Sequence, residues 1–445
     1  MSATLTDRYG YELTTSSDAA EHYVRAVDLT LSADTGAPEA FEAAVAADEG
    51  FALGYAGLAR MKQLRGQPTE AKATIARARE LTDGLGRRER QHVAAMNSVI
   101  NDDMNTALSN VQAHVAEFPR DAFVLAPAAS VLGLIGFSGR QDRNVEQLEF
   151  LDTVADAYGD DWWFLSTYAF AHNEAGRSEE ARPLIERSLQ LYERSGNSAH
   201  TMAHVQFETG QGDDGAAFLR NWLPGYESKA QLHRHIQWHY ALFMLQGGDL
   251  PGALGVYEQH IRPGVDDLSP LGTLMDSASL LWRVQLTDPE RELPWEPVAE
   301  LSASEFAKPG NQFADAHNAL AYAGCGDTAA LERLVESLWK HERSGKARAG
   351  EMVPAIAESL EAFAREDYAR AGEILAPVAE QVVRLGGSHA QREVFEDTLI
   401  EAWLRAGEGE QATVILRERL SRRPSARDEA WLERADVAAG APAGD

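Results

Sequence analysis

Histidines recur at helical spacing in two neighbouring stretches of the sequence. His200 and His204 lie four residues apart in HTMAHV. His235 and His239 have the same spacing in HIQWHYALF, 35 residues further along, member by member. Residues four apart share one face of an α-helix, so each pair offers two imidazoles side by side. Random placement of the chain's 13 histidines would give only about 0.4 pairs of this spacing.

Two such pairs supply up to four nitrogen ligands for one metal ion, because imidazole binds zinc, iron, copper and nickel. Three protein ligands and one open position would make a catalytic zinc site. A second interpretation needs no metal: a histidine held by an aspartate titrates near neutral pH and can act as an acid or a base. The third is a polar groove in which the histidines hydrogen-bond across neighbouring helices or contact a partner peptide.

Further polar residues follow at a similar offset. Asp276 and Arg283 lie in LGTLMDSASLLWRVQL, and Asp276 comes 41 residues after His235. Asp315 and His317 lie in NQFADAHNALAYAG, and His317 comes 41 residues after Asp276. If these segments are neighbouring inner helices, one groove holds at least five histidines and two aspartates.

An enzymatic site would divide these residues by role. The metal ligands would be His200, His204, His235 and His239. Groups able to move protons beside the metal are Asp276, His317 and Glu208. Groups able to contact a small-molecule substrate are Trp238, Arg283, Asp315 and Arg392. Hydrolysis is the simplest chemistry for such a site, with zinc as the favoured divalent ion and iron or manganese as alternatives.

The elements that carry these residues are helical hairpins. Apolar residues recur at helical spacing along almost the whole chain, broken by short Gly, Pro or Asp turns. In residues 164–192, Gly176 separates two helical segments, and Glu179 and Glu180 fall in the first turn of the second. The same order returns in four other stretches: residues 54–81, 238–261, 317–338 and 401–424. The pattern resembles the tetratricopeptide repeat, a 34-residue helix–turn–helix with small residues where its helices cross.

Such hairpins predict an all-α, tetratricopeptide-repeat-like solenoid, a right-handed superhelix in which neighbours stack to bury their apolar faces. We expect one continuous domain of about ten to eleven hairpins over residues 18–435. Residues 1–17 are expected to be a poorly ordered arm and residues 436–445 a disordered tail. An offset near 34 residues then places the two histidine pairs on adjacent inner helices, with axes about 8–10 Å apart.

Composition narrows the partners and the compartment. The net charge of −28 repels phosphate backbones, so we expect no nucleic-acid partner. No run of about 18 apolar residues predicts a membrane span, and the N-terminus lacks the pattern of a secretory signal. Cys325 is the single cysteine, so no internal disulfide can form, as expected in the reducing cytoplasm.

Several segments together resemble the tetratricopeptide repeat protein 38 family over residues 10–425. They are RRERQHVAA, HTMAHV, HIQWHYALF, DSASLLWR, FADAH and GGSHAQREVF. The resemblance implies that nine residues match the family pattern: His200, His204, His235, Trp238, His239, Asp276, Arg283, Asp315 and His317. The chain departs from that pattern at Phe207, where the family commonly has a glutamate. Glu208 is adjacent but is rotated by about 100° around the helix, which puts a uniform family activity in doubt.

The segment GGSHAQREVF also predicts a helix start. Gly386 and Gly387 can end one helix in a left-handed conformation. Ser388 can then cap the next helix, with Gln391 at the capping-box position. We expect this structural role for Ser388 in place of a nucleophilic one.

A non-catalytic scaffold is the alternative function. Superhelices of such repeats present extended concave surfaces that bind partners. The predicted inner helices carry His, Asp and Trp in place of Lys and Arg, which argues against an extended acidic peptide tail. Neutral or cationic peptides are the remaining peptide partners. Terminal hairpins with apolar faces would also allow a homodimer.

Overall fold

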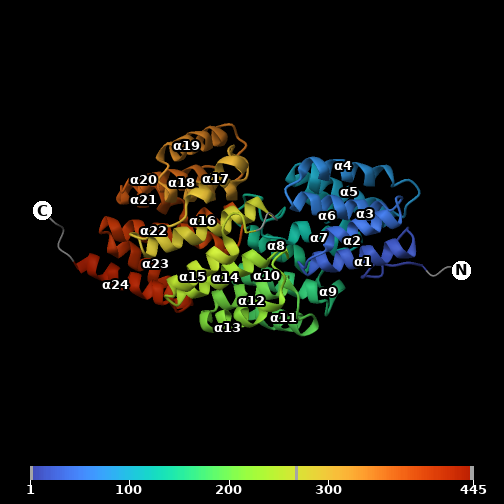
Figure 1. The fold of residues 1–445 in the computed structure, drawn as a ribbon, viewed down its shortest axis with the longest axis horizontal. Coiled ribbons are helices and arrows are strands. Elements are labelled where there is room, and N and C mark those ends of the chain that lie inside the picture. The colour runs from blue at the N-terminus through green and yellow to red at the C-terminus, as the bar shows by residue number, and fades with distance from the viewer. Residues whose placement is uncertain (1–3, 266–268, 441–445) are drawn as a thin grey trace. The chain divides into compact units, whose positions relative to one another are not determined.

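The computed structural model describes residues 4–265 and 269–440. This part of the chain forms 24 α-helices, two 3-10 helices and one π-helix; apart from them it holds one isolated bridge between Thr6 and Glu12. The predicted all-α fold of tetratricopeptide-repeat-like hairpins is confirmed (Figure 1). None of the described helices is long and apolar enough to cross a membrane.

Contacts divide the chain into two compact units. The first comprises residues 1–136, 144–201 and 226–233, and the second comprises residues 137–143, 202–225 and 234–445. The boundary falls inside α12 (Gly196–Glu208), which belongs in part to each unit. Whether the chain acts as one continuous domain stays a prediction.

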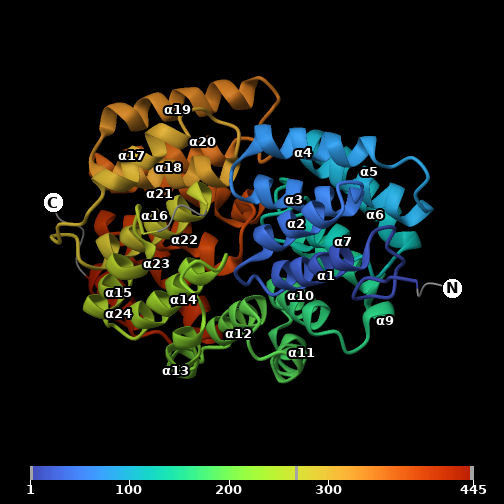
Figure 2. The same ribbon diagram turned by 45° about the vertical axis from the view of Figure 1, so that its right-hand side comes forward.

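The first unit consists of paired helices (Figure 2). They are α1 (Ser17–Leu31), α2 (Ala37–Ala47), α3 (Ala52–Leu64), α4 (Pro68–Glu80), α5 (Arg87–Asn101), α6 (Met104–Glu117), α7 (Ala122–Ala129), α8 (Arg143–Asp152), α9 (Ala155–Tyr158), α10 (Trp162–Glu174) and α11 (Ser178–Leu191). Helix α11 buries Ala181, Ile185 and Ser188, which lie on one face at helical spacing. Gly57 of α3 has no room for a Cβ, because that atom would overlap the ring of Phe41. Small residues at the crossings therefore bring the helices together, as the repeat pattern predicts.

The predicted N-terminal arm contacts this unit. Thr14 donates from its backbone nitrogen and its hydroxyl to the carboxylate of Glu89, at 2.9 and 2.7 Å. Asp7 pairs with Arg88 at 2.8 Å. Residues 4–16 are thus held against α5, whereas residues 1–3 lie outside the described residues.

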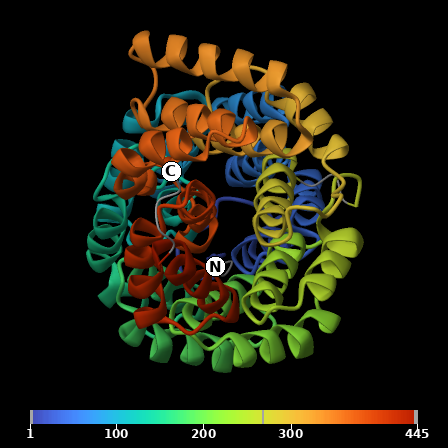
Figure 3. The ribbon, with the colours of Figure 1, turned by 90° about the vertical axis from the view of Figure 1, so that its left-hand side faces the viewer.

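The second unit is also built from paired helices. Its α-helices are α13 (Gly212–Trp222), α14 (His233–Gln246), α15 (Leu250–Val256), α16 (Pro270–Thr287), α17 (Glu296–Glu305), α18 (Gln312–Cys325), α19 (Thr328–Arg343), α20 (Met352–Ala364), α21 (Tyr368–Leu375), α22 (His389–Ala406), α23 (Gly409–Arg422) and α24 (Ala426–Gly440). The 3-10 helices are η1 (Leu223–Gly225) and η3 (Ala376–Leu385), and the π-helix is η2 (Tyr257–Ile261). The last three α-helices, red in Figure 3, pack against one another. The predicted tail is helical to Gly440, and residues 441–445 lie outside the described residues.

Helix α22 is buried on almost every face, although it carries several charged side chains. Trp282 of α16 donates to the hydroxyl of Thr398 at 2.9 Å. On another face, a Cβ at Gly372 of α21 would overlap the ring of Trp403. In an open array each hairpin contacts only its sequence neighbours. The contact between α16 and α22 crosses 116 residues, so this unit closes around a central helix.

The predicted cap of α22 is confirmed. Gly386 and Gly387 adopt positive φ angles of 93° and 69°. The Ser388 hydroxyl accepts from the Gln391 backbone nitrogen at 3.3 Å, and the Gln391 side chain accepts from the Ser388 backbone nitrogen at 2.9 Å. Both bonds satisfy donors that the first turn of a helix leaves unpaired.

Replacing Ser388 by alanine should lower the free energy of unfolding by about 1 kcal/mol, the usual cost of losing a serine cap. Urea unfolding followed by circular dichroism measures the change. Ser421→Ala is the matched control, because Ser421 is exposed inside α23 and caps no helix. Equal stability of the two variants would show that the capping box contributes nothing.

Candidate functional site

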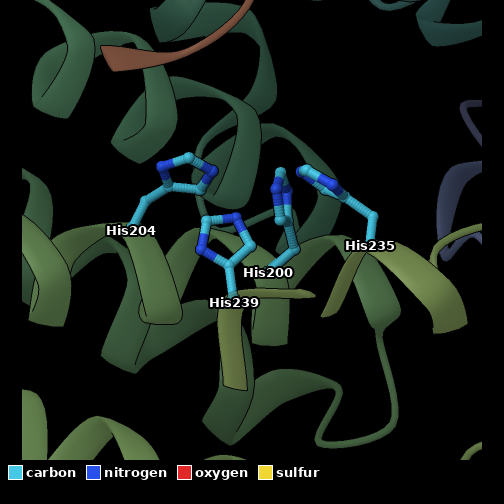
Figure 4. A group of neighbouring side chains, drawn as sticks. All are labelled: His200, His204, His235 and His239. Carbon is cyan, nitrogen blue, oxygen red and sulfur yellow. The ribbon is translucent and has the colours of Figure 1, made fainter. Parts of the chain in front are cut away.

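Four imidazoles meet where α12 and α14 lie side by side. His200 and His204 come from α12, one turn apart, and His235 and His239 come from α14. Each ring offers one nitrogen, and these four nitrogens lie within 4.8 Å of one another. Figure 4 shows the four rings gathered on one side of the two helices. We call this group the histidine tetrad.

The rings pack edge to face. The centroids of His204 and His239 are 4.3 Å apart, and those of His235 and His239 are 4.9 Å apart. His204 and His239 are buried, whereas His200 and His235 are half-buried. The tetrad therefore has two enclosed rings and two rings at its rim.

Burial sets the charge of the enclosed ring on α12. Loss of solvent, reinforced by neighbouring His235, lowers the pKa of His204 to about 3. At physiological pH His204 is thus neutral and keeps a nitrogen lone pair. The tetrad can accept a metal ion or a proton donor without first releasing a proton from this ring.

Asp276 lies behind the rim ring of α14. Its Oδ1 is 2.8 Å from Nδ1 of His235, and its Oδ2 is 3.5 Å from Nε of Arg234. The carboxylate is 1% exposed. A carboxylate in this position fixes the orientation of an imidazole and leaves the other ring nitrogen, Nε2, facing away from it. The structure joins Asp276 to the tetrad through His235.

Trp238 and Arg283 are engaged inside the protein. Trp238 stacks on the ring of His235, with centroids 5.2 Å apart, and donates to the hydroxyl of Ser279 at 3.1 Å. The guanidinium of Arg283 lies 5.6 Å from the centre of the Trp238 ring. Arg283 also pairs with Asp397 at 3.2 Å and is 1% exposed. These contacts hold the ring of Trp238 in place against His235 of the tetrad.

Glu208 lies beside Phe207 on α12 and interacts electrostatically with His204 of the tetrad. It pairs with His389 of α22, Oε1 to Nδ1, at 2.8 Å. Burial opposes the charge of Glu208, but His389 outweighs burial and lowers the pKa of the carboxyl, while Glu208 raises the pKa of His389. Phe207 is buried, 4.1 Å from the guanidinium of Arg423. Phe207 and Glu208 therefore join α12 to the C-terminal helices.

The remaining predicted residues make contacts elsewhere. His317 bonds the Phe313 carbonyl through Nδ1 at 2.7 Å, and burial lowers its pKa to about 4. Asp315 accepts from the Gly310 nitrogen at 3.1 Å, and burial raises its pKa to about 7. Arg392 donates to the Gly387 carbonyl at the start of α22. The hydrogen bonds of His317 and Asp315 both lie at the start of α18, and Asp276 on the packed neighbour α16 also acts on His317 electrostatically.

A second histidine group lies in the first unit. Its members are not at the repeat spacing, so the sequence did not indicate the group. His92 Nδ1 and His114 Nε2 lie 2.9 and 3.0 Å from the same oxygen, Oδ2 of Asp121. The Arg88 guanidinium lies 2.8 Å from that oxygen as well. All four side chains are buried. The segment RRERQHVAA therefore lies on an ion-paired helix whose buried side carries Arg88 and His92. Only the register of α5 against α6 reveals these ion pairs.

The second unit also encloses a network of ion pairs that the sequence did not indicate. Its acids are Glu393, Asp397 and Asp428, and its bases are Arg283, Arg419, Arg423 and Arg427. Asp397 alone lies within 2.8 to 3.2 Å of three guanidiniums. Nothing local in RERLSRRPSAR identifies the partners of its arginines.

Comparison with known proteins gives one family match. The tetratricopeptide repeat model matches residues 162–187, which cover α10 and most of α11. Among solved structures, the chain is similar to yeast Tom70 at 13% identity and a TM-score of 0.32, covering 95% of each chain. It is similar to the human IFIT1 dimer with m7Gppp-AAAA at 13% identity and a TM-score of 0.37, covering 98% of each chain.

A third similar structure is Naa15/Naa10 bound to HypK-THB, at 13% identity and a TM-score of 0.22. The alignment covers 95% of this chain and 68% of that chain.

The prediction of a metal-dependent hydrolase is wrong. The matched model describes a structural repeat of the kind that builds binding surfaces, not a catalytic domain. The chain contains a tetratricopeptide repeat, and its fold is of the tetratricopeptide-repeat type.

Proposed function

We propose that the protein is a non-catalytic scaffold that binds a protein or peptide partner on its helical hairpins. The match of the α10–α11 hairpin to the tetratricopeptide repeat carries the proposal. Stacked repeats of this kind present side chains over extended surfaces, and such surfaces bind partners without chemical change. The single cysteine, Cys325, is a free thiol and supports a reducing compartment, the cytoplasm, as the place of action.

Charge favours a cationic partner. Among the described residues, eight arginines and nine carboxylates are buried, so the core is close to neutral. Nearly all of the net charge of −28 therefore lies outside the core. A negative surface attracts basic segments and accelerates their association, and it repels acidic ones.

Resemblance to the tetratricopeptide repeat protein 38 family is part of the proposal. Its support is that two of the resembling segments supply interior groups. HIQWHYALF contributes the buried Trp238 and His239, and DSASLLWR contributes the buried Asp276 and Arg283. A pattern kept at such positions describes the architecture of the second unit.

The test compares two synthetic peptides of equal length, one lysine-rich and one glutamate-rich, titrated calorimetrically into the full chain. We expect the lysine-rich peptide to bind and the glutamate-rich peptide not to bind. Binding should weaken as salt rises, because the screening length falls from about 10 Å at 0.1 M to about 3 Å at 1 M. Chelator should leave this binding unchanged.

Crosslinking in cell extract, followed by mass spectrometry, then identifies the natural partner, whose basic segment should bind the purified chain. Replacing the lysines and arginines of that segment by glutamine is the control and should abolish binding. Preference for the acidic peptide, or equal binding of the glutamine version, would reject a cationic partner.

A further inference from the structure

The histidine tetrad combines ligand type, number and spacing in a way that the scaffold function does not explain. His204, His235 and His239 lie in the second unit, and His200 precedes His204 by one turn of α12. Tetrahedral zinc with nitrogen ligands at about 2.0–2.1 Å places those nitrogens about 3.3 Å apart. The four nitrogens here lie within 4.8 Å. Small rotations of the side chains therefore suffice to close the rings on one ion.

We propose that the histidine tetrad binds one divalent transition-metal ion, with zinc favoured, in a closed shell of four imidazole nitrogens. The ligand set excludes carboxylate, so it suits zinc, cobalt, nickel or copper better than magnesium, calcium or manganese. Four protein ligands fill a tetrahedral shell and leave no position for a water molecule. The bound ion is structural: it joins α12 to α14 and performs no hydrolysis.

The surroundings of the tetrad favour a cation. Asp276 contacts Nδ1 of His235, so Nε2 of that ring is the ligand atom. A buried carboxylate behind a metal-binding histidine orients the ring, raises its basicity and offsets part of the positive charge of the ion.

The second group, His92, His114 and Asp121, shows what a buried histidine cluster looks like when a cation position is already filled. There the Arg88 guanidinium lies 2.8 Å from the shared carboxylate oxygen. A divalent ion at that oxygen would stand beside a fixed positive charge that Asp121 already compensates. We therefore assign the metal to the tetrad alone, and His92 becomes a matched control.

The experiment uses the full chain without a histidine tag, stripped with chelator and titrated with Co²⁺ or Zn²⁺ alone. We expect one equivalent per chain by equilibrium dialysis and elemental analysis. Bound Co²⁺ should show the intense visible absorption of tetrahedral coordination, which a surface ion in octahedral geometry lacks. His204→Ala with His239→Ala should abolish this equivalent, whereas His92→Gln and His317→Gln should retain it.

Two further variants keep the test decisive if the double variant fails to fold. His235→Ala removes a half-buried ligand at the rim and leaves three imidazoles, so it should weaken metal binding and change the Co²⁺ spectrum while helicity persists. Asp276→Asn keeps all four ligands and should weaken binding by about 10–100-fold with a shifted Co²⁺ spectrum.

The proposal is overturned if the stripped wild-type chain takes up no equivalent of either ion. It is equally overturned if the His235 variant binds Co²⁺ with the affinity and the spectrum of the wild type, which would indicate an adventitious ion only. Peptide binding that continues in either case would leave the scaffold function standing, so the two proposals fail separately.

Discussion

Replacement of Asp397 by alanine should lower the free energy of unfolding by about 3–5 kcal/mol, the cost of breaking a buried ion pair from one side. The carboxylate is fully buried and pairs with Arg283, Arg419 and Arg427 at 3.2, 2.8 and 3.0 Å. Its loss leaves three guanidiniums in the interior with too little negative charge. Urea unfolding followed by circular dichroism measures the effect.

Asp160→Ala is the matched control, because Asp160 pairs with Arg187 on the exposed surface. Solvent screens such a pair, so this variant should unfold close to the wild-type urea concentration. If both variants unfold together, the buried network does not hold the C-terminal helices in place. Replacing Asp397 by asparagine should give an intermediate result, because the amide oxygen still accepts hydrogen bonds.

Saturation of the histidine tetrad with zinc should raise the melting temperature by roughly 5–10 °C for a unit of this size. An ion present at 100 times its dissociation constant stabilises the folded state by about 2.7 kcal/mol, since it binds that state alone. The physical origin is the link between α12 and α14, which the unfolded chain cannot make. Circular dichroism melts with zinc and with chelator measure the shift.

The chain with His204→Ala and His239→Ala serves as control and should melt at the same temperature with zinc and with chelator. A shift of equal size in that variant would assign the stabilisation to metal bound elsewhere. Melts at two protein concentrations would also test the homodimer, which stays a prediction, because dimerisation makes the melting temperature depend on concentration.

The fold was accessible from sequence because its determinants are local. Gly176, with a φ of 78°, marks the turn of the α10–α11 hairpin, and Ala181 permits the close crossing. The capping box of α22 also involves residues only three apart. Helical spacing, turn glycines and caps each act within one hairpin, so no knowledge of distant contacts was needed.

The histidine tetrad was accessible for a related reason. An offset of 35 residues is close to the repeat length, and the repeat itself makes neighbouring first helices adjacent. The position of Asp276 beside His235 was predicted less closely, because the offset of 41 residues between them is longer than one repeat and includes a longer linker. The same offset separates His317 from Asp276, and the two interact electrostatically between the packed helices α16 and α18.

The sequence by itself determined the helical hairpins, their turns and caps, and the pairing of histidines on adjacent helices. Only the tertiary structure decided that α22 lies at the centre of the second unit, that Glu208 meets His389 across 181 residues, and that Arg283 reaches the Ala390 carbonyl across 107. Helical periodicity specifies which face of a helix is apolar but not which distant helix covers it. Packing decides which distant helix covers that face, and this in turn decides the partners of the buried charges.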